Sequence, residues 1–96
     1  MTESKTADLI RDLNKFGEER FREGSFKEAE DRFRTALDVY RNARNGGGGR
    51  HIEILSTITG LVRSLESQGK DAEAALVLRQ EYETVTDIID MLQNRS

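Results

Sequence analysis

The side chains that could carry out catalysis or bind a metal are few and scattered. His51 is the only histidine among the 96 residues, and cysteine is absent, so a zinc site would lack its usual ligands. Carboxylates are numerous, but neighbours such as Glu18 and Glu19 point to different faces of a helix and do not form an acid–base pair. The alternating acidic pattern of a calcium loop is also missing. The sequence predicts a chain that is not an enzyme and uses no metal or cofactor.

The segment around the glycine run is the other candidate for chemistry. Asn45 is followed by four glycines and then by Arg50 and His51. A glycine-rich turn before a helix can hold phosphate through free N–H groups, but no strand precedes this one and no Gly-Lys-Ser/Thr follows. A plain loop is the interpretation favoured. Nearby Arg41 and Arg44 can meet an acidic partner or phosphate, yet they equally suit the negative end of a helix dipole, which is the preferred explanation.

Composition limits the class of partner. The chain carries 15 basic and 18 acidic side chains, a formal net charge of −3, so nucleic acid is not expected as a partner. The longest apolar run, residues 74–78, is far shorter than the roughly 18 residues of a membrane span, and no signal peptide is recognisable at the N-terminus. We expect a cytoplasmic protein that does not engage a membrane.

The elements that position these residues are all predicted to be helices. Apolar residues recur at spacings near 3.6, no proline interrupts them, and Gly24, the glycine run and Gly69 separate them. The sequence predicts an all-α single domain with helices over residues 6–23, 25–44, 50–68 and 71–92. Ser25 and Glu28 have the spacing of a capping box for the second helix. Gly60 lies within the third helix, where close packing against a neighbour is expected to offset its cost of about 1 kcal/mol.

The first half of the chain carries a recognisable pattern of small and large residues. It consists of Leu13, Phe16, Gly17, Gly24, Phe26, Ala29, Phe33 and Ala36. This pattern resembles the tetratricopeptide repeat, in which small residues lie where two helices cross and large ones surround the crossing. The resemblance implies that Gly17 and Ala29 bring two antiparallel helices together and that Phe16 and Phe33 fill the space around them.

A weaker second copy follows at a shift of 45 residues, which takes Ala29 to Ala74. Ile58, Leu61, Gly69 and Leu78 then fall in the roles of the first copy. The period exceeds the roughly 34 residues of the standard repeat, and the glycine linker with His51 resembles the longer repeats of kinesin light chains. The resemblance implies four helices in two stacked hairpins, residues 6–44 and 50–93, forming a short right-handed solenoid.

The resemblance also implies a binding groove. In this family the first helix of each hairpin lines a concave surface that holds a peptide. The corresponding positions, together with a neighbouring aromatic residue, are Arg11, Asn14, Glu18, Phe21, Arg22, Thr59, Arg63 and Glu66. Asn14 and Glu18 stand where some family members carry the lysine and asparagine that grip a carboxylate, so that clamp is not expected here. An ordinary solvated helix surface is the competing explanation.

The fourth predicted helix has more apolar residues than one hairpin needs. Its main stripe is Ala74, Leu78, Tyr82, Val85, Ile89 and Leu92, and the residues outside that stripe are Leu76, Val77, Ile88 and Met91. Surplus apolar surface on a helix indicates an interface, although the helix can also bend back over its own hairpin. Two functions therefore compete: a module that binds another protein or peptide, and a module that forms a homo-oligomer through this helix.

Overall fold

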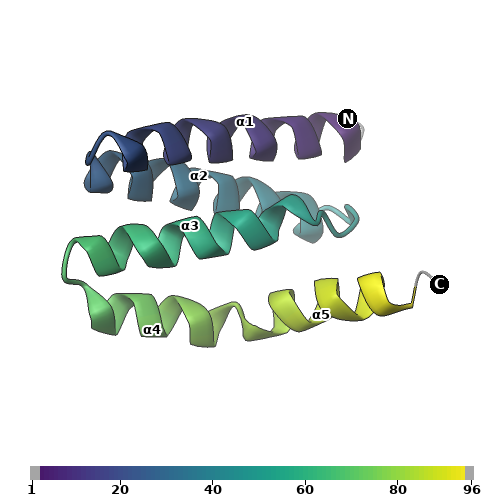
Figure 1. The fold of residues 1–96 in the computed structure, drawn as a ribbon. Helices are drawn as coiled ribbons and strands as arrows, with labels where there is room; N and C mark the ends of the chain where they lie inside the picture. Colours follow the sequence, from purple (N-terminus) through teal and green to yellow (C-terminus); the bar gives the residue numbers. More distant parts are fainter. Residues whose placement is uncertain (1–2, 95–96) are drawn as a thin grey trace.

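The structure, a computed structural model, describes residues 3–94 and contains five α-helices and no strand within them. The helices are α1 (Glu3–Arg22), α2 (Phe26–Asn45), α3 (Glu53–Ser67), α4 (Asp71–Gln80) and α5 (Tyr82–Gln93). The all-α prediction is confirmed, and the predicted count of four helices is wrong because the last one is divided. Figure 1 shows α1 at one edge, α2 and α3 between, and α4 with α5 at the opposite edge.

The same backbone turn closes both hairpins. At the first, Gly24 has φ 80°, and Ser25 N–H donates to the Arg20 carbonyl at 2.9 Å. At the second, Gly69 has φ 77°, and Lys70 N–H donates to the Leu65 carbonyl at 2.9 Å. Both turns have the 6→1 hydrogen bond of a Schellman motif, which requires one residue in the left-handed conformation. Glycine adopts that conformation without strain.

The predicted capping box at the start of α2 does not form. The Ser25 side chain makes no capping hydrogen bond. Its carbonyl accepts the first helical bond, from Ala29 N–H at 2.9 Å, so the preceding turn already fixes the direction in which α2 begins. The favourable spacing of Ser25 and Glu28 was a local signal that the tight hairpin geometry overrides.

The glycine run forms a loop that returns the chain to the start of α3. Gly47 takes φ 89°, and the Arg44 guanidinium donates to the Gly48 carbonyl at 2.8 Å. The loop is longer than predicted, because α3 begins at Glu53. His51, predicted to lie in the first turn of the third helix, instead belongs to this loop. It is buried, and its ring lies edge-on to Tyr40 with centroids 6.3 Å apart.

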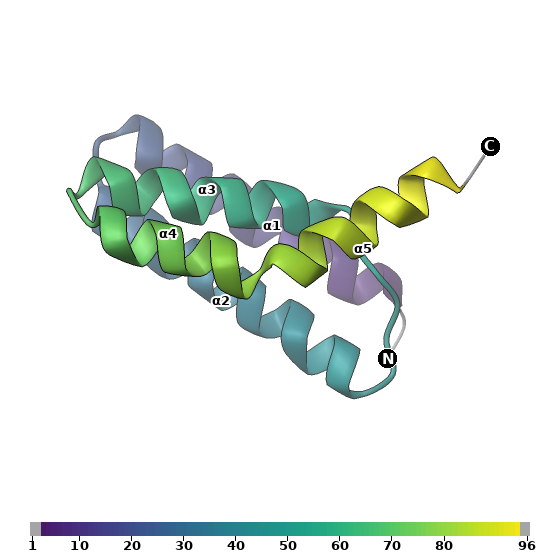
Figure 2. The ribbon, with the colours of Figure 1, turned by 90° about the horizontal axis from the view of Figure 1, so that it is seen from below.

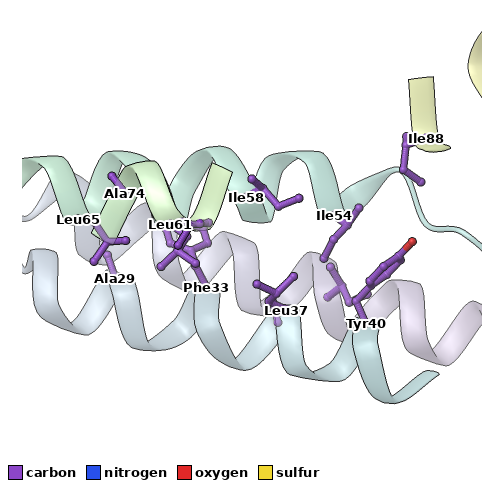
Figure 3. Close-up of a cluster of buried hydrophobic side chains, with 13 residues drawn as sticks. Ala29, Phe33, Leu37, Tyr40, Ile54, Ile58, Leu61, Leu65, Ala74 and Ile88 are labelled. Atoms are coloured by element: carbon purple, nitrogen blue, oxygen red, sulfur yellow. The ribbon is translucent and has the colours of Figure 1, made fainter. Parts of the chain in front are cut away.

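One aromatic ring joins the first three helices. Phe33 of α2 is 1% exposed, and its ring lies against Gly17 of α1 and Gly60 of α3. A Cβ at residue 17 would lie 2.7 Å from the Phe33 Cζ, so both helices reach the ring only because they carry glycine there. Ala29 is also fully buried. The predicted close approaches at Gly17, Ala29 and Gly60 are confirmed, and Figure 3 shows Phe33 in the middle of the core.

Two large residues assigned to that core lie elsewhere. Phe16 is 52% exposed and Leu78 is 52% exposed, so neither fills a helix crossing. Phe16 precedes Gly17, and its side chain leaves the helix about 100° away from that glycine. The Phe33 ring alone fills the space beside Gly17 and Gly60, so the Phe16 ring is not required there.

The predicted fourth helix bends at Glu81. This residue has φ −99° and ψ 10° and is buried, paired with the Arg41 guanidinium of α2. Its N–H still donates to the Val77 carbonyl at 2.9 Å, and its carbonyl accepts from Val85 N–H at 3.0 Å, so the bend is confined to one position. Figure 2 shows α5 leaving the line of α4 and running past the start of α3.

Candidate partner-binding groove

A groove of about 550 Å³ opens between α1 and α3. Its lining brings together five of the eight residues predicted for the partner groove: Glu18, Phe21, Arg22, Thr59 and Arg63. The other lining residues were not assigned to it from the sequence, and they are Phe33, Leu55, Ser56 and Gly60. The sequence signal for Phe33 and Gly60 was the pair of glycines, Gly17 and Gly60, because a glycine within a helix lets a neighbouring side chain pack against the backbone.

Helical spacing explains why these side chains meet. Residues 18, 21 and 22 are three or four apart on α1, and residues 56, 59, 60 and 63 are three or four apart on α3, so each set shares one helix face. The two helices pack side by side over α2. Phe33 rises from α2 beneath them and forms an apolar floor, while the walls carry charged and hydroxyl side chains together with the apolar Phe21 and Leu55.

A cation–π contact fixes one wall. The guanidinium carbon of Arg63 lies 4.9 Å from the centroid of the Phe21 ring, within the range of a favourable contact. Phe21 in turn packs edge-on against Phe26, with ring centroids 5.1 Å apart. Arg63 is thus held across the groove by the first hairpin. Neither Arg22 nor Arg63 forms an ion pair with a carboxylate in the described part of the chain.

Three predicted groove residues lie outside the groove. Asn14 is only 6% exposed: its amide donates to the Glu53 carbonyl at 3.0 Å, and it accepts from the Thr57 hydroxyl at 2.7 Å. It joins α1 to α3 and is not available to a partner. Arg11 pairs with Asp8 at 2.7 Å and with Glu53 at 3.0 Å, and Glu66 is exposed but does not line the groove.

The predicted self-association face is largely internal. Val77 and Ile88 belong to the buried core, and Met91 packs partly against it, so only Leu76 of the four is exposed. Figure 3 shows Ile88 pointing from α5 toward the end of the core at Tyr40 and Ile54. Of the predicted main stripe, Ala74 is buried and Val85 and Leu92 pack partly against the core. The other three residues of that stripe are exposed: Leu78, Tyr82 and Ile89.

The two buried carboxylates are structural. Glu30 accepts from Arg34 at 2.7 Å and from Gln68 at 2.9 Å, with Lys70 at 3.5 Å. Burial alone would raise the pKa of Glu30, but the Arg34 and Gln68 hydrogen bonds and the adjacent cations outweigh it and lower the pKa from 4.5 to about 2. Glu81 accepts from Arg41 and from the Thr84 hydroxyl. Neither was singled out from the sequence.

The remaining candidates are His51 and a second hollow beside Tyr40. His51 is buried, and its Nε2 has no hydrogen-bond partner among the described residues. A smaller hollow of about 380 Å³ lies beside Tyr40 and the Arg41–Glu81 pair, and burial raises the pKa of Tyr40. Residues 3–94 contain no group of three histidine or carboxylate ligands placed to hold a metal ion.

Comparisons with protein-family models, with characterised proteins and with solved structures found no match for this chain. The tetratricopeptide resemblance therefore rests on the residue pattern alone. Over residues 3–94, no helix combines the length and the apolar character that crossing a bilayer requires.

Proposed function

We propose that this chain is a cytoplasmic protein-interaction module whose groove between α1 and α3 binds a peptide segment or helix of another protein. The observation that carries the proposal is the groove itself, which combines apolar side chains, Phe21, Phe33 and Leu55, with charged and hydroxyl side chains around them. Binding sites combine an apolar base with a few polar groups that fix orientation. The volume of about 550 Å³ suits a few anchoring side chains of a partner.

We further propose that the module is a short tetratricopeptide-type repeat. Two features support this assignment. The turns at Gly24 and Gly69 have the same hydrogen-bond pattern, as expected of repeated hairpins, and the small residues Gly17 and Ala29 are buried at the contact between α1 and α2. The bend at Glu81, which divides the predicted fourth helix into α4 and α5, departs from the two-helix hairpin of this repeat.

The charged walls of the groove favour recognition by a few anchors. Arg22 and Arg63 lack carboxylate partners of their own, so an acidic group on a bound segment would not have to displace an existing ion pair. Binding energy at such surfaces concentrates in a few residues around a desolvated centre. Here the apolar surface available to a partner comes from Phe21 and Leu55, which are half-buried beside Phe33. Arg63, already ordered by Phe21, loses little freedom on binding.

The test is selection of peptides from a random library, followed by affinity measurements on a matched pair of variants. Thr59 lines the groove and donates to the Leu55 carbonyl at 2.9 Å. Thr35 is another exposed threonine, on α2, and it donates to the Asp31 carbonyl at 2.9 Å. Thr59→Trp fills the groove, whereas Thr35→Trp makes the same change on a different surface.

We expect Thr59→Trp to weaken binding of the selected peptides by tenfold or more, about 1.4 kcal/mol, and Thr35→Trp to leave it unchanged. Circular dichroism of both variants confirms that each is folded. Selected peptides that bind Thr59→Trp as tightly as the original chain, or a library that yields no specific binder, would contradict the proposal.

A further inference from the structure

α1 and α3 run in the same direction, and the contacts between them show which residues lie level with each other (Figure 1). Three contacts join residues that are 42 or 43 positions apart: Arg11 with Glu53, Asn14 with Thr57, and Phe21 with Arg63. Because this offset stays constant along both helices, residue 18 lies level with residues 60 and 61, and residue 22 with residues 64 and 65. Both helices therefore pass the two ends of the groove in the same order.

The charged side chains of the groove follow one another along it. Glu18 lies one helical turn before Arg22 on α1, a rise of about 6 Å, and Arg63 of α3 lies at nearly the level of Arg22. Ser56 and Thr59 precede Arg63 on α3 and line the groove at the Glu18 end. We call Glu18, Ser56 and Thr59 the acidic end of the groove, and Arg22 and Arg63 the basic end.

The chain does not neutralise these charges itself. Glu18 and Arg22 have the i,i+4 spacing at which ion pairs form on a helix, but neither they nor Arg63 forms an ion pair within residues 3–94. Outside the groove lining, Arg20 and Glu23 of the same helix do pair, at 3.1 Å. All three groove charges are exposed, so a bound segment can supply their partners without displacing an existing ion pair.

The spacing of the groove walls favours an extended segment over a helix. Helices that pack against each other, as α1 and α3 do, have axes about 8–10 Å apart. A third helix is about 10–12 Å across with its side chains and would rest above the groove, whereas one face of an extended chain can enter it. In an extended chain the side chains of residues i and i+2 point the same way and lie about 6.6 Å apart, which matches the rise of about 6 Å between Glu18 and Arg22.

We propose that the groove binds an extended segment in which one residue separates a basic side chain from an acidic one. The basic side chain pairs with Glu18, and the acidic one pairs with Arg22 and Arg63. A segment with two acidic side chains would place one of them against Glu18, and a segment with two basic side chains would place one of them against both arginines. This inference rests on the proposed peptide-binding function and adds to it the charge pattern of the bound segment.

The test is selection from three peptide libraries that are random except for one fixed pair of charged residues with a single residue between them. The pair is lysine with glutamate, in both orders, in the first library, two glutamates in the second and two lysines in the third. Binders from every library are resynthesised in all three charge versions, and their affinities are measured by fluorescence anisotropy. We expect the mixed-charge version to bind at least about threefold more tightly than either like-charged version, because an exposed attraction replaces a repulsion. Raising the salt concentration should reduce this preference.

Two neighbouring glutamates provide a matched pair of variants. Glu18→Gln removes the carboxylate of the acidic end, and Glu19→Gln makes the same change on a residue that does not line the groove. We expect Glu18→Gln to bind the doubly acidic peptides as tightly as the mixed-charge ones. Glu19→Gln should keep the original preference, and circular dichroism should show unchanged helical content in both variants.

Two results would overturn the inference and leave the peptide-binding function in place. One is an original chain that binds doubly acidic peptides as tightly as mixed-charge peptides, and the other is an equal loss of preference in Glu18→Gln and Glu19→Gln. If instead none of the three libraries yields a binder that Thr59→Trp weakens, both the charge pattern and the proposed function of the groove are wrong.

Discussion

Gly60→Ala sets two known effects against each other, and the structure decides between them. Alanine is favoured over glycine within a helix by about 1 kcal/mol, so a sequence argument alone predicts that the change stabilises α3. The structure predicts the opposite. A Cβ at residue 60 would overlap the Phe33 ring, with Cε2 at 2.7 Å, closer than carbon atoms approach without a shift of one of them.

The magnitude depends on whether the Phe33 ring can move aside. A ring tip can yield cheaply when the space behind it is empty, but here Gly17 lies on the other side, and a Cβ there would be 2.7 Å from the same ring. Phe33 is 1% exposed, so the backbones must separate instead. Overpacking of this kind costs about 1–3 kcal/mol. After subtracting the helix preference, we expect Gly60→Ala to lower the free energy of unfolding by up to about 2 kcal/mol.

Urea unfolding followed by circular dichroism measures this loss, and the Phe33→Leu background tests its cause. With the ring removed, Gly60→Ala no longer meets an obstacle and should stabilise the chain by up to about 1 kcal/mol, the helix preference alone. The sign of the effect therefore reverses between the two backgrounds. A stabilising Gly60→Ala in the original chain, or the same loss in both backgrounds, would refute the claim that Phe33 requires glycine on both sides.

Three further predictions concern the buried polar contacts. Folding lowers the pKa of Glu30 from 4.5 to about 2, so the ionised carboxylate stabilises the fold above pH 4.5 and this stabilisation is lost as pH falls toward 2. In urea unfolding, the difference in free energy of unfolding between the original chain and Glu30→Gln should therefore shrink by up to about 3 kcal/mol between pH 4.5 and 2. Asn14→Leu leaves the Thr57 hydroxyl without its acceptor and should lower the free energy of unfolding by about 1–3 kcal/mol, whereas Asn14→Leu with Thr57→Val should recover part of that loss in the same assay. Arg41→Met leaves the Glu81 carboxylate buried without its cation and should lower the free energy of unfolding by about 1–2 kcal/mol. The double variant with Glu81→Leu should lose less, as chemical denaturation of the two variants and the original chain would show.

Local signals were sufficient to predict most of the fold. The glycines at 24 and 69 were correctly expected to end helices, because a left-handed residue has few alternatives to glycine. The packing role of Gly60 followed from the same kind of argument, since a glycine within a helix needs a compensating contact. The roles of these glycines are set by the local backbone conformation, so they can be predicted from a single sequence.

The errors arose where a distant residue decided the outcome. Either stripe of residues 71–93 is apolar enough to face the core, and the purer one was assigned there. The structure buries the helix face that contains Val77, Glu81 and Ile88, because Arg41, forty positions earlier, supplies the ion pair of Glu81. Likewise Asn14 looked like a surface residue of α1, and only the Thr57 hydroxyl of α3 makes its burial favourable.

The position of Phe33 links the stability of the fold to the proposed groove. The ring holds α1, α2 and α3 together and also forms the groove floor, so a change that enlarges the floor also weakens the core. Any tuning of partner choice must therefore come from the walls, where Glu18, Arg22 and Thr59 are exposed. A substitution such as Arg22→Glu is expected to alter which peptides are selected while leaving the free energy of unfolding within about 0.5 kcal/mol. Phe33→Leu is expected to reduce both together, so the two variants separate recognition from folding.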